Sequence, residues 1–400
     1  MNEPCDIAIV GGGPVGAALA LALRDNDLNV VLLEAREAEI NSTDPRALAL
    51  AYGSRLLLQR LGAWNAIPNV SSIREIEITQ KGTPGKTTLK AAELKVPEMG
   101  YVLPYTALHA ALQHALHQSD IHCLYGATVS DLNSSGGHAA LTYQHQGAQH
   151  TLHARLVVVA DGGKLLEVSH PPQITDYGQS GLIAHVNCSQ PRAGMAFEHF
   201  TPQGPMALLP YLDGYELVLT AAHEKAEEML TWDDATFLAF LQTHFDDRGC
   251  DTLLAQPADC GSSVGTFTAI GKRSCYPLRL KRAPDLTFPH TVLIGNAAQT
   301  LHPVAGQGFN MGLRDAWELA QVILDHAPDN IGSAAMCAAY RQSRRPDRTA
   351  GIRFTDGLVR LFSNDLPLLG PLRSAALTLL DHLPLAKKFV ARRMMFGSNG

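Results

Sequence analysis

The first 34 residues constrain the fold more than any other part of the sequence. Asp6–Val10 is a short run, apolar after its first residue, which is typical of a buried parallel strand. Gly11–Gly16 follows with the pattern G-x-G-x-x-G, and the small and leucine side chains of residues 17–23 are typical of a helix. A second apolar run, Leu28–Leu33, ends at Glu34. This order of elements predicts a Rossmann-type βαβ unit that binds a dinucleotide.

The residues of the glycine turn each have a mechanical role in such a unit. Gly11 permits the tight turn, Gly13 lets a pyrophosphate approach the backbone, and Gly16 lets the helix pack closely on the strand. Pro14 and Val15 begin the helix, whose free N–H groups and positive dipole end would face the phosphates. We therefore expect the segment from Gly11 to Gly16 to hold a pyrophosphate.

Glu34 is the expected ligand of a ribose. It lies eighteen positions after Gly16, close to the spacing of about 20 at which an acid bonds ribose hydroxyls in such units. An acidic residue here, rather than a basic one, favours an adenosine ribose without a 2′-phosphate. A lone glycine triplet would be weak evidence, but here strand, turn, helix, strand and acid are continuous.

Two later segments repeat the pattern of a buried strand that ends in glycine. Leu156–Ala160 is followed by Asp161, Gly162 and Gly163, and Thr291–Ile294 is followed by Gly295. The segment His302–Asn310 then leads into a helical pattern. Backbone N–H groups at these strand ends would point at one place, which suits an anion or the electron-rich edge of a flavin ring.

With these segments, nearly the whole chain resembles the class A flavoprotein aromatic hydroxylases of the p-hydroxybenzoate hydroxylase type, and within them the ubiquinone-biosynthesis hydroxylases. Most members carry Gly-Asp-Ala-Ala-His where this chain has Asn296 and Gln299 at the second and fifth positions. That form resembles one branch, the 2-polyprenyl-6-methoxyphenol hydroxylases. The segments that carry the resemblance are Gly11–Gly16, Asp44–Ala47, Ala160–Gly162, Tyr177–Ser180, Phe197–Thr201, Gly204–Pro205, Tyr276–Leu278, Gly295–Gln299 and Gly306–Asn310.

The resemblance implies a mixed α/β fold of the p-hydroxybenzoate hydroxylase kind. A Rossmann-type FAD domain would be discontinuous in sequence, formed by residues 1–73, 101–165 and 276–345. Residues 74–100 and 166–275, which contain several β-like runs, would form a β-sheet substrate domain over the flavin. The leucine-rich residues 346–400 would form a C-terminal region of several short helices, because prolines interrupt the pattern.

The resemblance also implies a role for individual residues. Glu34 would bind the adenosine ribose, Arg46 would reach the flavin side of the pyrophosphate, and the backbone of Val129 would touch the adenine. Asp161 would lie near the cofactor, and Asn296 would replace the acid that hydrogen-bonds the ribityl chain. The expected FAD contacts are Gly11, Gly13, Pro14, Val15, Gly16, Glu34, Arg46, Val129, Asp161, Asn296, Pro303, Gly306, Gln307, Gly308, Phe309 and Asn310.

The implied reaction is hydroxylation of the phenolic ring of 2-polyprenyl-6-methoxyphenol to the 1,4-benzoquinol, with O₂ as co-substrate and a flavin C4a-hydroperoxide as oxidant. Another ring position in the same pathway, a flavin oxidoreductase that inserts no oxygen, and a non-catalytic scaffold subunit remain as alternatives. His302 is the candidate catalytic acid or base. There is no second G-x-G-x-x-G unit, so NADPH, NADH or a protein reductase could each donate the electrons.

Composition bounds the partners and the location. A formal net charge of −6 gives no reason to expect nucleic acid, and no residue spacing suggests a metal site. Seven scattered cysteines and the lack of a long apolar run suggest a cytoplasmic protein. The histidines at 109, 114 and 117 are expected on a solvated helix.

Basic residues near the C-terminus allow two interpretations. They either belong to helices packed on the flavin domain, or form a face that meets the inner membrane or a multiprotein quinone-biosynthesis complex, where the lipophilic prenylated substrate is found. These basic residues are Arg373, Lys387, Lys388, Arg392 and Arg393.

Overall fold

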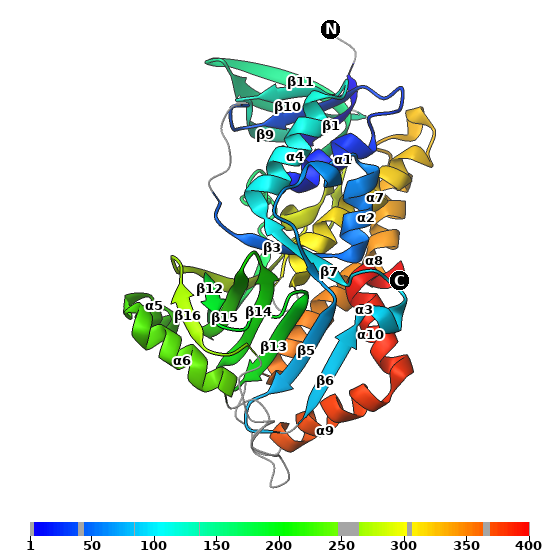
Figure 1. Ribbon diagram of the computed structural model, residues 1–400. Coiled ribbons are helices and arrows are strands. Elements are labelled where there is room, and N and C mark those ends of the chain that lie inside the picture. Colours follow the sequence, from blue (N-terminus) through cyan, green and yellow to red (C-terminus); the bar gives the residue numbers. More distant parts are fainter. Residues whose placement is uncertain are drawn as a thin grey trace.

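A computed structural model shows a mixed α/β molecule built around three sheets (Figure 1). The expected fold class is therefore confirmed. The structure describes residues 4–38, 44–83, 85–135, 137–246, 264–301, 306–362 and 369–399. Among these residues, no helix combines the length and the apolar character that crossing a bilayer requires.

The first sheet is mostly parallel and contains the predicted βαβ unit. Its central strands are buried on both faces, and Ile7, Ala8 and Ile9 of β1 are fully inaccessible to solvent. The strand order is β18-β19-β11-β1-β2-β8, and β10 pairs with β11 and with β9. The strands are β1 (Cys5–Val10), β2 (Val30–Glu34), β8 (His122–Tyr125), β9 (Thr128–Ser135), β10 (His138–His145), β11 (Ala148–Val159), β18 (Thr287–Phe288) and β19 (Thr291–Leu293).

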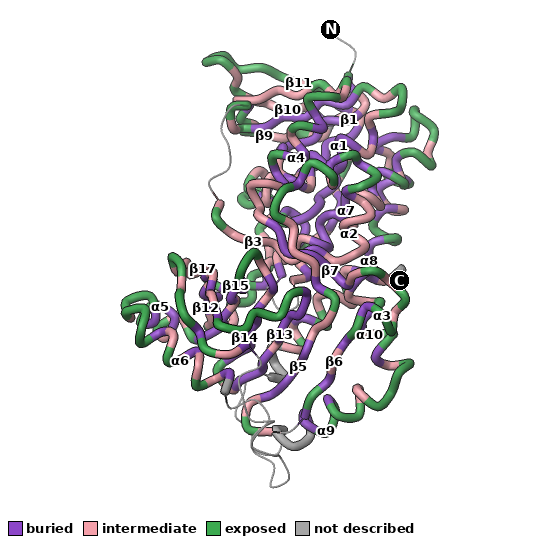
Figure 2. Tube along the Cα trace, viewed as in Figure 1, coloured by how far each residue is buried: buried purple, intermediate pink, exposed green. Residues whose placement is uncertain are grey.

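Three helices that are distant in sequence pack together beside this sheet. Helix α1 (Pro14–Ala22) contacts both α4 (Tyr105–His117) and α7 (Gln307–Leu324). From Gly16 onward the residues of α1 are glycine, alanine or leucine, so its neighbours can approach closely on more than one side. Figure 2 shows the resulting band of buried residues through β1, α1 and α7.

The second sheet has nine strands and its own hydrophobic core. Phe197, Tyr215 and other large side chains of one face pack under α5 (His223–Thr231) and α6 (Asp234–Asp246). The order is β20-β17-β12-β15-β14-β13-β5-β6, with β16 paired to β12. The strands are β5 (Glu75–Gln80), β6 (Lys86–Lys90), β12 (Gln173–Cys188), β13 (Met195–Thr201), β14 (Gly204–Tyr211), β15 (Gly214–Ala222), β16 (Phe267–Ile270), β17 (Ser274–Arg282) and β20 (Gln299–Thr300).

A small third sheet lies between the two large ones, as Figure 1 shows. It consists of β3 (Ala47–Ala51), β7 (Gly100–Pro104) and β4 (Ser71–Ile73). Helix α2 (Tyr52–Arg60) contacts β3 and β7 of this sheet, whereas α3 (Ala91–Leu94) contacts β6 of the second sheet. Short 3₁₀ turns complete the described chain: η1 (Trp64–Ala66), η3 (Gly295–Ala297), η5 (Pro328–Asn330) and η6 (Gly397–Asn399).

The C-terminal part is helical, but its first helix is longer than the sequence suggests. Helix α8 (Ala334–Phe362) continues through Pro346, whereas Pro384 begins α10 (Pro384–Phe396) in the usual first-turn position. Helix α9 (Leu369–His382) packs on β6. The expected domain limits remain a prediction. Strand β17 spans the expected boundary at residue 276, and helix α8 spans the one at residue 346.

Candidate cofactor site

The carboxyl ends of five parallel strands, β19, β11, β1, β2 and β8, meet at one edge of the first sheet. The chain leaves β1 toward β2 on one side, and β11 lies on the other side, so this edge is a topological switch point where such sheets bind ligands. The turn after β1, the turn after β11 and the turn after β19 therefore lie side by side. Backbone hydrogen bonds join the start of each turn to the end of a neighbouring strand: Gly11 N–H to Leu33 O at 2.8 Å, Ala160 N–H to Val10 O at 2.8 Å, and Ile294 N–H to Val159 O at 3.1 Å.

Two glycines of the first turn are required by the packing of the chain itself. Gly11 has a φ of +106°, and a Cβ there would lie 2.8 Å from the carbonyl carbon of Ala160. A Cβ on Gly16 would lie 2.0 Å from the carbonyl oxygen of Gly11. Strand, turn and helix are therefore in closer contact than any side chain would allow.

Gly13 differs, because no part of the described chain fills the space beside it. A Cβ at this position would meet nothing within 4 Å, and Gly13 caps α1 without any side-chain hydrogen bond. The first N–H groups of α1 thus have open space in front of them and no side-chain acceptor at the cap. An open space before a helix N-terminus fits a pyrophosphate, so the residues present suit FAD here.

Pro14 and Val15 begin α1 in different surroundings. Pro14 is buried at the first helical position, where its missing N–H costs nothing. The side chain of Val15 packs on the third turn and on α7, because Cβ atoms built on Gly295 and Gly312 would lie 3.2 and 2.9 Å from its methyl groups. Val15 thus aligns the first turn with the third, and it remains partly exposed.

Glu34 closes the first turn from the end of β2. Its Oε2 accepts a hydrogen bond from Gly12 N–H at 2.6 Å, and its Oε1 accepts from the backbone N–H and the Nε of Arg36 at 3.0 and 2.8 Å. Burial raises the pKa of this carboxyl, but the bonds and charge of Arg36, with Gly12 N–H, outweigh burial and lower the pKa. The ionised carboxylate keeps lone pairs that could accept ribose hydroxyls.

Helix α4 supplies a layer of support that sequence reasoning missed. Arg36 lies 3.4 Å from Nε2 of His109, which is buried rather than solvated as expected, and burial together with the charge of Arg36 lowers the pKa of His109. Gln113 donates from Nε2 to the carbonyl of Gly12 at 2.8 Å and accepts from Tyr125 Oη at 2.7 Å. The i,i+4 spacing of His109 and Gln113 was the available signal.

Asp161 shapes the second turn from within. Its two carboxylate oxygens accept the N–H groups of Gly163 at 2.7 Å and of Leu165 at 2.8 Å. Gly162 has a φ of +82°, and a Cβ there would meet nothing within 4 Å. The carboxylate thus holds the turn, and open space adjoins the turn at Gly162; a contact between Asp161 and FAD stays a prediction.

The third turn is fastened to α7 and α8 by a buried acid that sequence reasoning also missed. Asp315 accepts through Oδ2 the N–H of Gly295 at 3.0 Å and Nε2 of Gln299 at 2.9 Å. Its Oδ1 forms an ion pair with Arg344 at 2.7 Å, with both side chains almost fully buried. Asn296, between these anchor points, is exposed. The expected ribityl contact of Asn296 stays a prediction.

The start of α7 is held mainly by its own side chains. Gly306 caps the helix with a φ of +60°, and Asn310 is almost fully buried. The amide of Asn310 accepts from Ala51 N–H at 2.8 Å and Ser54 Oγ at 2.6 Å, and donates to the carbonyls of Ala49 at 3.0 Å and Gly306 at 2.7 Å.

The other residues of this segment leave a flavin mainly backbone to contact. The Nε2 of Gln307 donates to the carbonyl of Met394 at 3.2 Å, and Phe309 packs against the core of the first sheet. A Cβ at Gly308 would meet nothing within 4 Å. We therefore expect flavin contacts from the backbone around Gly308. His302 and Pro303 lie outside the described residues.

Arg46 lies where the first and second sheets face each other. Its guanidinium forms a two-point ion pair with Asp44 and lies 6.0 and 5.4 Å from the ring centres of Tyr105 and Tyr276. Tyr276 belongs to β17 of the second sheet. The side chain is 43% exposed, so donors remain for a pyrophosphate. Val129, on β9, is half-buried against the core of the first sheet.

Two acids lie on the face of the second sheet that is turned toward β3 and Arg46. Phe197 and Tyr215 point into the core under α5 and α6, so their neighbours Glu198 and Glu216 lie on the opposite face of the sheet. Burial raises the pKa of Glu198 to about 8 and that of Glu216 to about 7, although the N–H of Ala47 in β3 lowers the latter. Such groups can exchange protons near neutral pH, and sequence reasoning did not single them out.

Comparison with known proteins assigns the family. The FAD binding domain family matches residues 4–355. The chain is 31% identical to ubiquinone hydroxylase UbiL of Rhodospirillum rubrum, covering 98% of this chain and 90% of that protein. It is 30% identical to 3-demethoxyubiquinol 3-hydroxylase of Escherichia coli, covering 97% of each.

Solved structures confirm the fold of the p-hydroxybenzoate hydroxylase kind. The p-nitrophenol 4-monooxygenase PnpA of Pseudomonas putida superposes with a TM-score of 0.74 at 15% identity, covering 99% of this chain and 98% of that one. PqsL of Pseudomonas aeruginosa, a probable FAD-dependent monooxygenase, gives 0.72 at 18% identity, covering 94% and 99%. The chain thus belongs to the FAD-dependent monooxygenase family that contains the ubiquinone-biosynthesis hydroxylases.

Proposed function

We propose that this monooxygenase hydroxylates the phenolic ring of a polyprenylated ubiquinone precursor, with 2-polyprenyl-6-methoxyphenol as the substrate. The observation that carries the proposal is full-length relatedness to ubiquinone hydroxylase UbiL and to 3-demethoxyubiquinol 3-hydroxylase. Ubiquinone biosynthesis monooxygenase COQ6 of Homo sapiens is a third such relative, 28% identical over 96% of this chain. The choice among ring positions rests on Asn296 and Gln299 alone, and Gln299 is bound to Asp315 inside the protein.

Different residues of the chain would bind different parts of FAD. The N-terminus of α1 would bind the pyrophosphate in the space beside Gly13, and Glu34 would bind the adenosine ribose. Asn296 would bind the ribityl chain from the third turn. FAD, when bound and reduced, would supply the oxygen chemistry, with NAD(P)H as electron donor.

The second sheet would cover the reacting centre. Its face that carries Glu198 and Glu216 is turned toward β3 and Arg46, and it would exclude water and orient the phenol ring. In its ionised form, a buried glutamate with a raised pKa is a stronger base than a free one and can accept the phenolic proton, which makes the ring more electron-rich before oxygen transfer.

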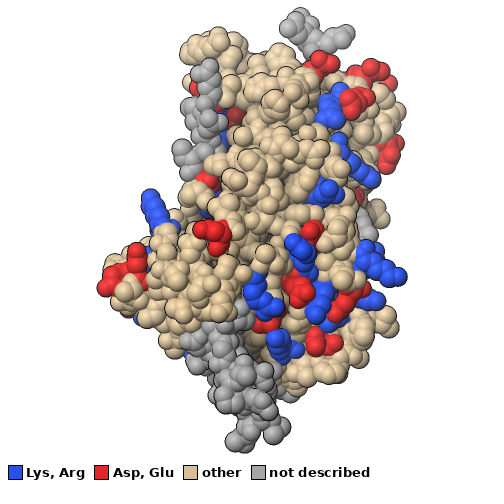
Figure 3. Space-filling model, in the orientation of Figure 1, with Lys and Arg blue, Asp and Glu red and all other residues tan. Residues whose placement is uncertain are grey.

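The helices α9 and α10 offer a surface for a membrane that contains the lipid substrate. Leu385 and Phe389 are 84% and 67% exposed, and Lys388 and Arg392 share their face of α10 at helical spacing. Figure 3 shows basic side chains, with acids between them, around α10 and α3. Only part of the expected basic set is available, because Arg373 and Lys387 are buried, and Lys387 binds Asp381 and Glu93. We propose peripheral contact with anionic lipid; a quinone-biosynthesis complex is the alternative occupant.

Isotope labelling tests the reaction. FAD-loaded protein is incubated with NADPH or NADH, 2-polyprenyl-6-methoxyphenol and ¹⁸O₂, and the product is analysed by mass spectrometry. One ¹⁸O atom in a 1,4-benzoquinol is the expected result. A label at another ring position would support the alternative hydroxylase, and an altered product without label would support an oxidoreductase.

Deletion of the gene tests the pathway in the cell. We expect a polyprenyl-methoxyphenol to accumulate and ubiquinone to fall, and a plasmid copy of the gene should reverse both. An unchanged quinone profile would contradict the proposed substrate even if the purified protein hydroxylates other phenols.

A further inference from the structure

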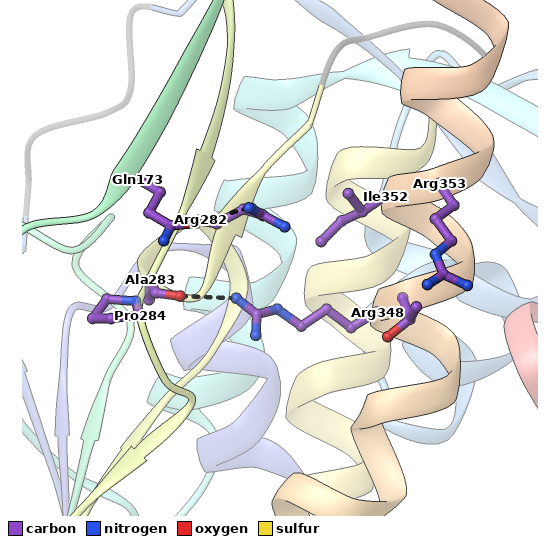
Figure 4. A pocket seen from close by; sticks show the side chains of 8 residues that line it. Gln173, Arg282, Ala283, Pro284, Arg348, Ile352 and Arg353 are labelled. Atoms are coloured by element: carbon purple, nitrogen blue, oxygen red, sulfur yellow. Dashed lines mark hydrogen bonds between the residues drawn. The ribbon is translucent and has the colours of Figure 1, made fainter.

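A cavity of about 280 Å³ lies between the end of β17 and the middle of α8, lined by residues that have no role in the proposed reaction. Three of its eight lining residues are arginines, Arg282, Arg348 and Arg353, and none is a carboxylate. Figure 4 shows Arg282 and Arg348 extending from opposite walls into the gap, with Arg353 along α8. Among the described residues, positive charge is therefore concentrated around this cavity.

These arginines keep unused hydrogen-bond donors. Arg348 donates through Nη2 to the carbonyls of Ala283 and Ala298 at 3.2 and 3.3 Å, but its buried Nε has no partner among the described residues. Arg282 donates through Nη2 to Oε1 of Gln173 at 2.8 Å. A guanidinium has five N–H donors, so Arg282 and Arg348 each have donors beyond those used in these hydrogen bonds.

The chain supplies little opposite charge here. Burial lowers the pKa of Arg348; Asp315 raises it, and the positive charge of Arg282 lowers it further. The nearby carboxylates already have partners, since Asp285 forms an ion pair with Arg341 at 3.0 Å and Asp315 one with Arg344 at 2.7 Å. An anion between Arg282 and Arg348 would relieve their repulsion.

We propose that this cavity binds the phosphate or diphosphate group of an anionic ligand. Arginine forks match phosphate oxygens in pairs, and two walls that each present one fork suit a tetrahedral anion. The volume lies below the range of about 300–1,000 Å³ that is typical of pockets for whole organic ligands. The phosphate end therefore enters the cavity, and the rest of the ligand stays outside.

Hydrogen bonds to one backbone carbonyl connect the proposed anion site to the candidate cofactor site. Arg348 holds the carbonyl of Ala298, which also accepts the N–H of Ala283 at 2.9 Å. Ala298 follows directly on η3, the third turn of the candidate cofactor site. The inference does not depend on the proposed substrate, because it rests on the arginines alone.

Calorimetric titration with sodium diphosphate tests the site. The protein is first saturated with FAD, so that the turn at Gly13 is filled and cannot take the added diphosphate. We expect saturable binding that weakens at least tenfold in the double variant Arg282→Gln, Arg353→Gln, and that survives in Arg192→Gln, an exposed arginine between β12 and β13. Because Arg353 is exposed, Arg353→Gln alone should keep the fold and still weaken binding.

Competition identifies the source of the phosphate. NADPH and NADH, inorganic phosphate, and vesicles with or without phosphatidylglycerol are each added to the diphosphate complex. Displacement by a dinucleotide, by free phosphate or by anionic vesicles supports the proposal and names the ligand class. Absence of saturable diphosphate binding, or equal binding by the wild type and the double variant, would overturn it.

Discussion

The two large sheets differ in how the chain specifies them. In the first sheet, β1, the glycine turn, α1 and β2 follow each other within 34 residues, and β1 and β2 are apolar apart from Asp6 and Glu34. In the second sheet, β13 pairs in parallel with β5, so that Met195 lies opposite Glu75, 120 positions earlier. The expected grip on FAD is thus encoded mostly by local sequence, whereas the cover over the reacting centre depends on long-range pairing.

The largest expected effect is that of a substitution at Gly16, which differs from Gly13 in its surroundings although both belong to the same glycine pattern. Gly16→Val should abolish soluble, folded protein, because even a Cβ would lie 2.0 Å from the carbonyl oxygen of Gly11. Soluble yield and the circular dichroism spectrum of the variant measure the loss. A folded Gly16→Val protein with normal thermal stability would show that α1 does not pack on the turn as described.

Gly13→Val should leave the fold intact and remove the cofactor. Its Cβ would meet no protein atom within 4 Å, so apo-protein stability should change little, while the side chain occupies the space proposed for the pyrophosphate. We expect FAD affinity to fall by roughly a hundredfold or more, about 2.7 kcal/mol at least. Flavin absorbance of the purified protein and titration with FAD measure it. Full FAD occupancy would contradict the proposed phosphate position.

Glu198→Gln tests the second sheet through the pH dependence of stability. The pKa of Glu198 in the folded protein, about 8, lies above the usual value of 4.5, so the folded state binds the extra proton between these pH values. Its contribution is complete below about pH 4.5 and is lost as the pH rises through 8. The variant should therefore be more stable than the wild type at pH 9, by on the order of a few kcal/mol, with a smaller difference at pH 5.

Urea unfolding at pH 5, 7 and 9 measures this difference. Glu227→Gln, on the exposed side of α5, is the matched control and should show no such trend. A difference between Glu198→Gln and wild type that does not grow with pH would mean that this carboxyl is not desolvated in the folded protein.

The smallest expected effect concerns the C-terminal helices. The double variant Leu385→Glu, Phe389→Glu should keep its fold and its FAD, because both side chains are largely exposed, and should bind anionic vesicles several-fold more weakly. Vesicle flotation measures binding. Val168→Glu, at an exposed apolar residue outside α9 and α10, is the control. Equal flotation of both variants and the wild type would remove the proposed membrane surface.

Local sequence sufficed for the elements whose side chains act on their near neighbours. The glycine turn, the strands that precede Gly11 and Asp161, and the acid at Glu34 could all be predicted, since each depends on backbone conformation or spacing within a short stretch. The family resemblance extended this prediction to the overall fold, which the solved relatives confirm.

What holds those elements together was decided only by the tertiary structure. Asp315 reaches Gly295 and Arg344, Gln113 reaches Gly12, and Asn310 reaches Ala51, 259 positions away. Periodicity and motif spacing report which face of an element is buried, but they do not report which distant polar group will lie opposite. For the same reason the arginine cavity has no signature in the sequence: its walls are brought together only when α8 packs beside the end of β17.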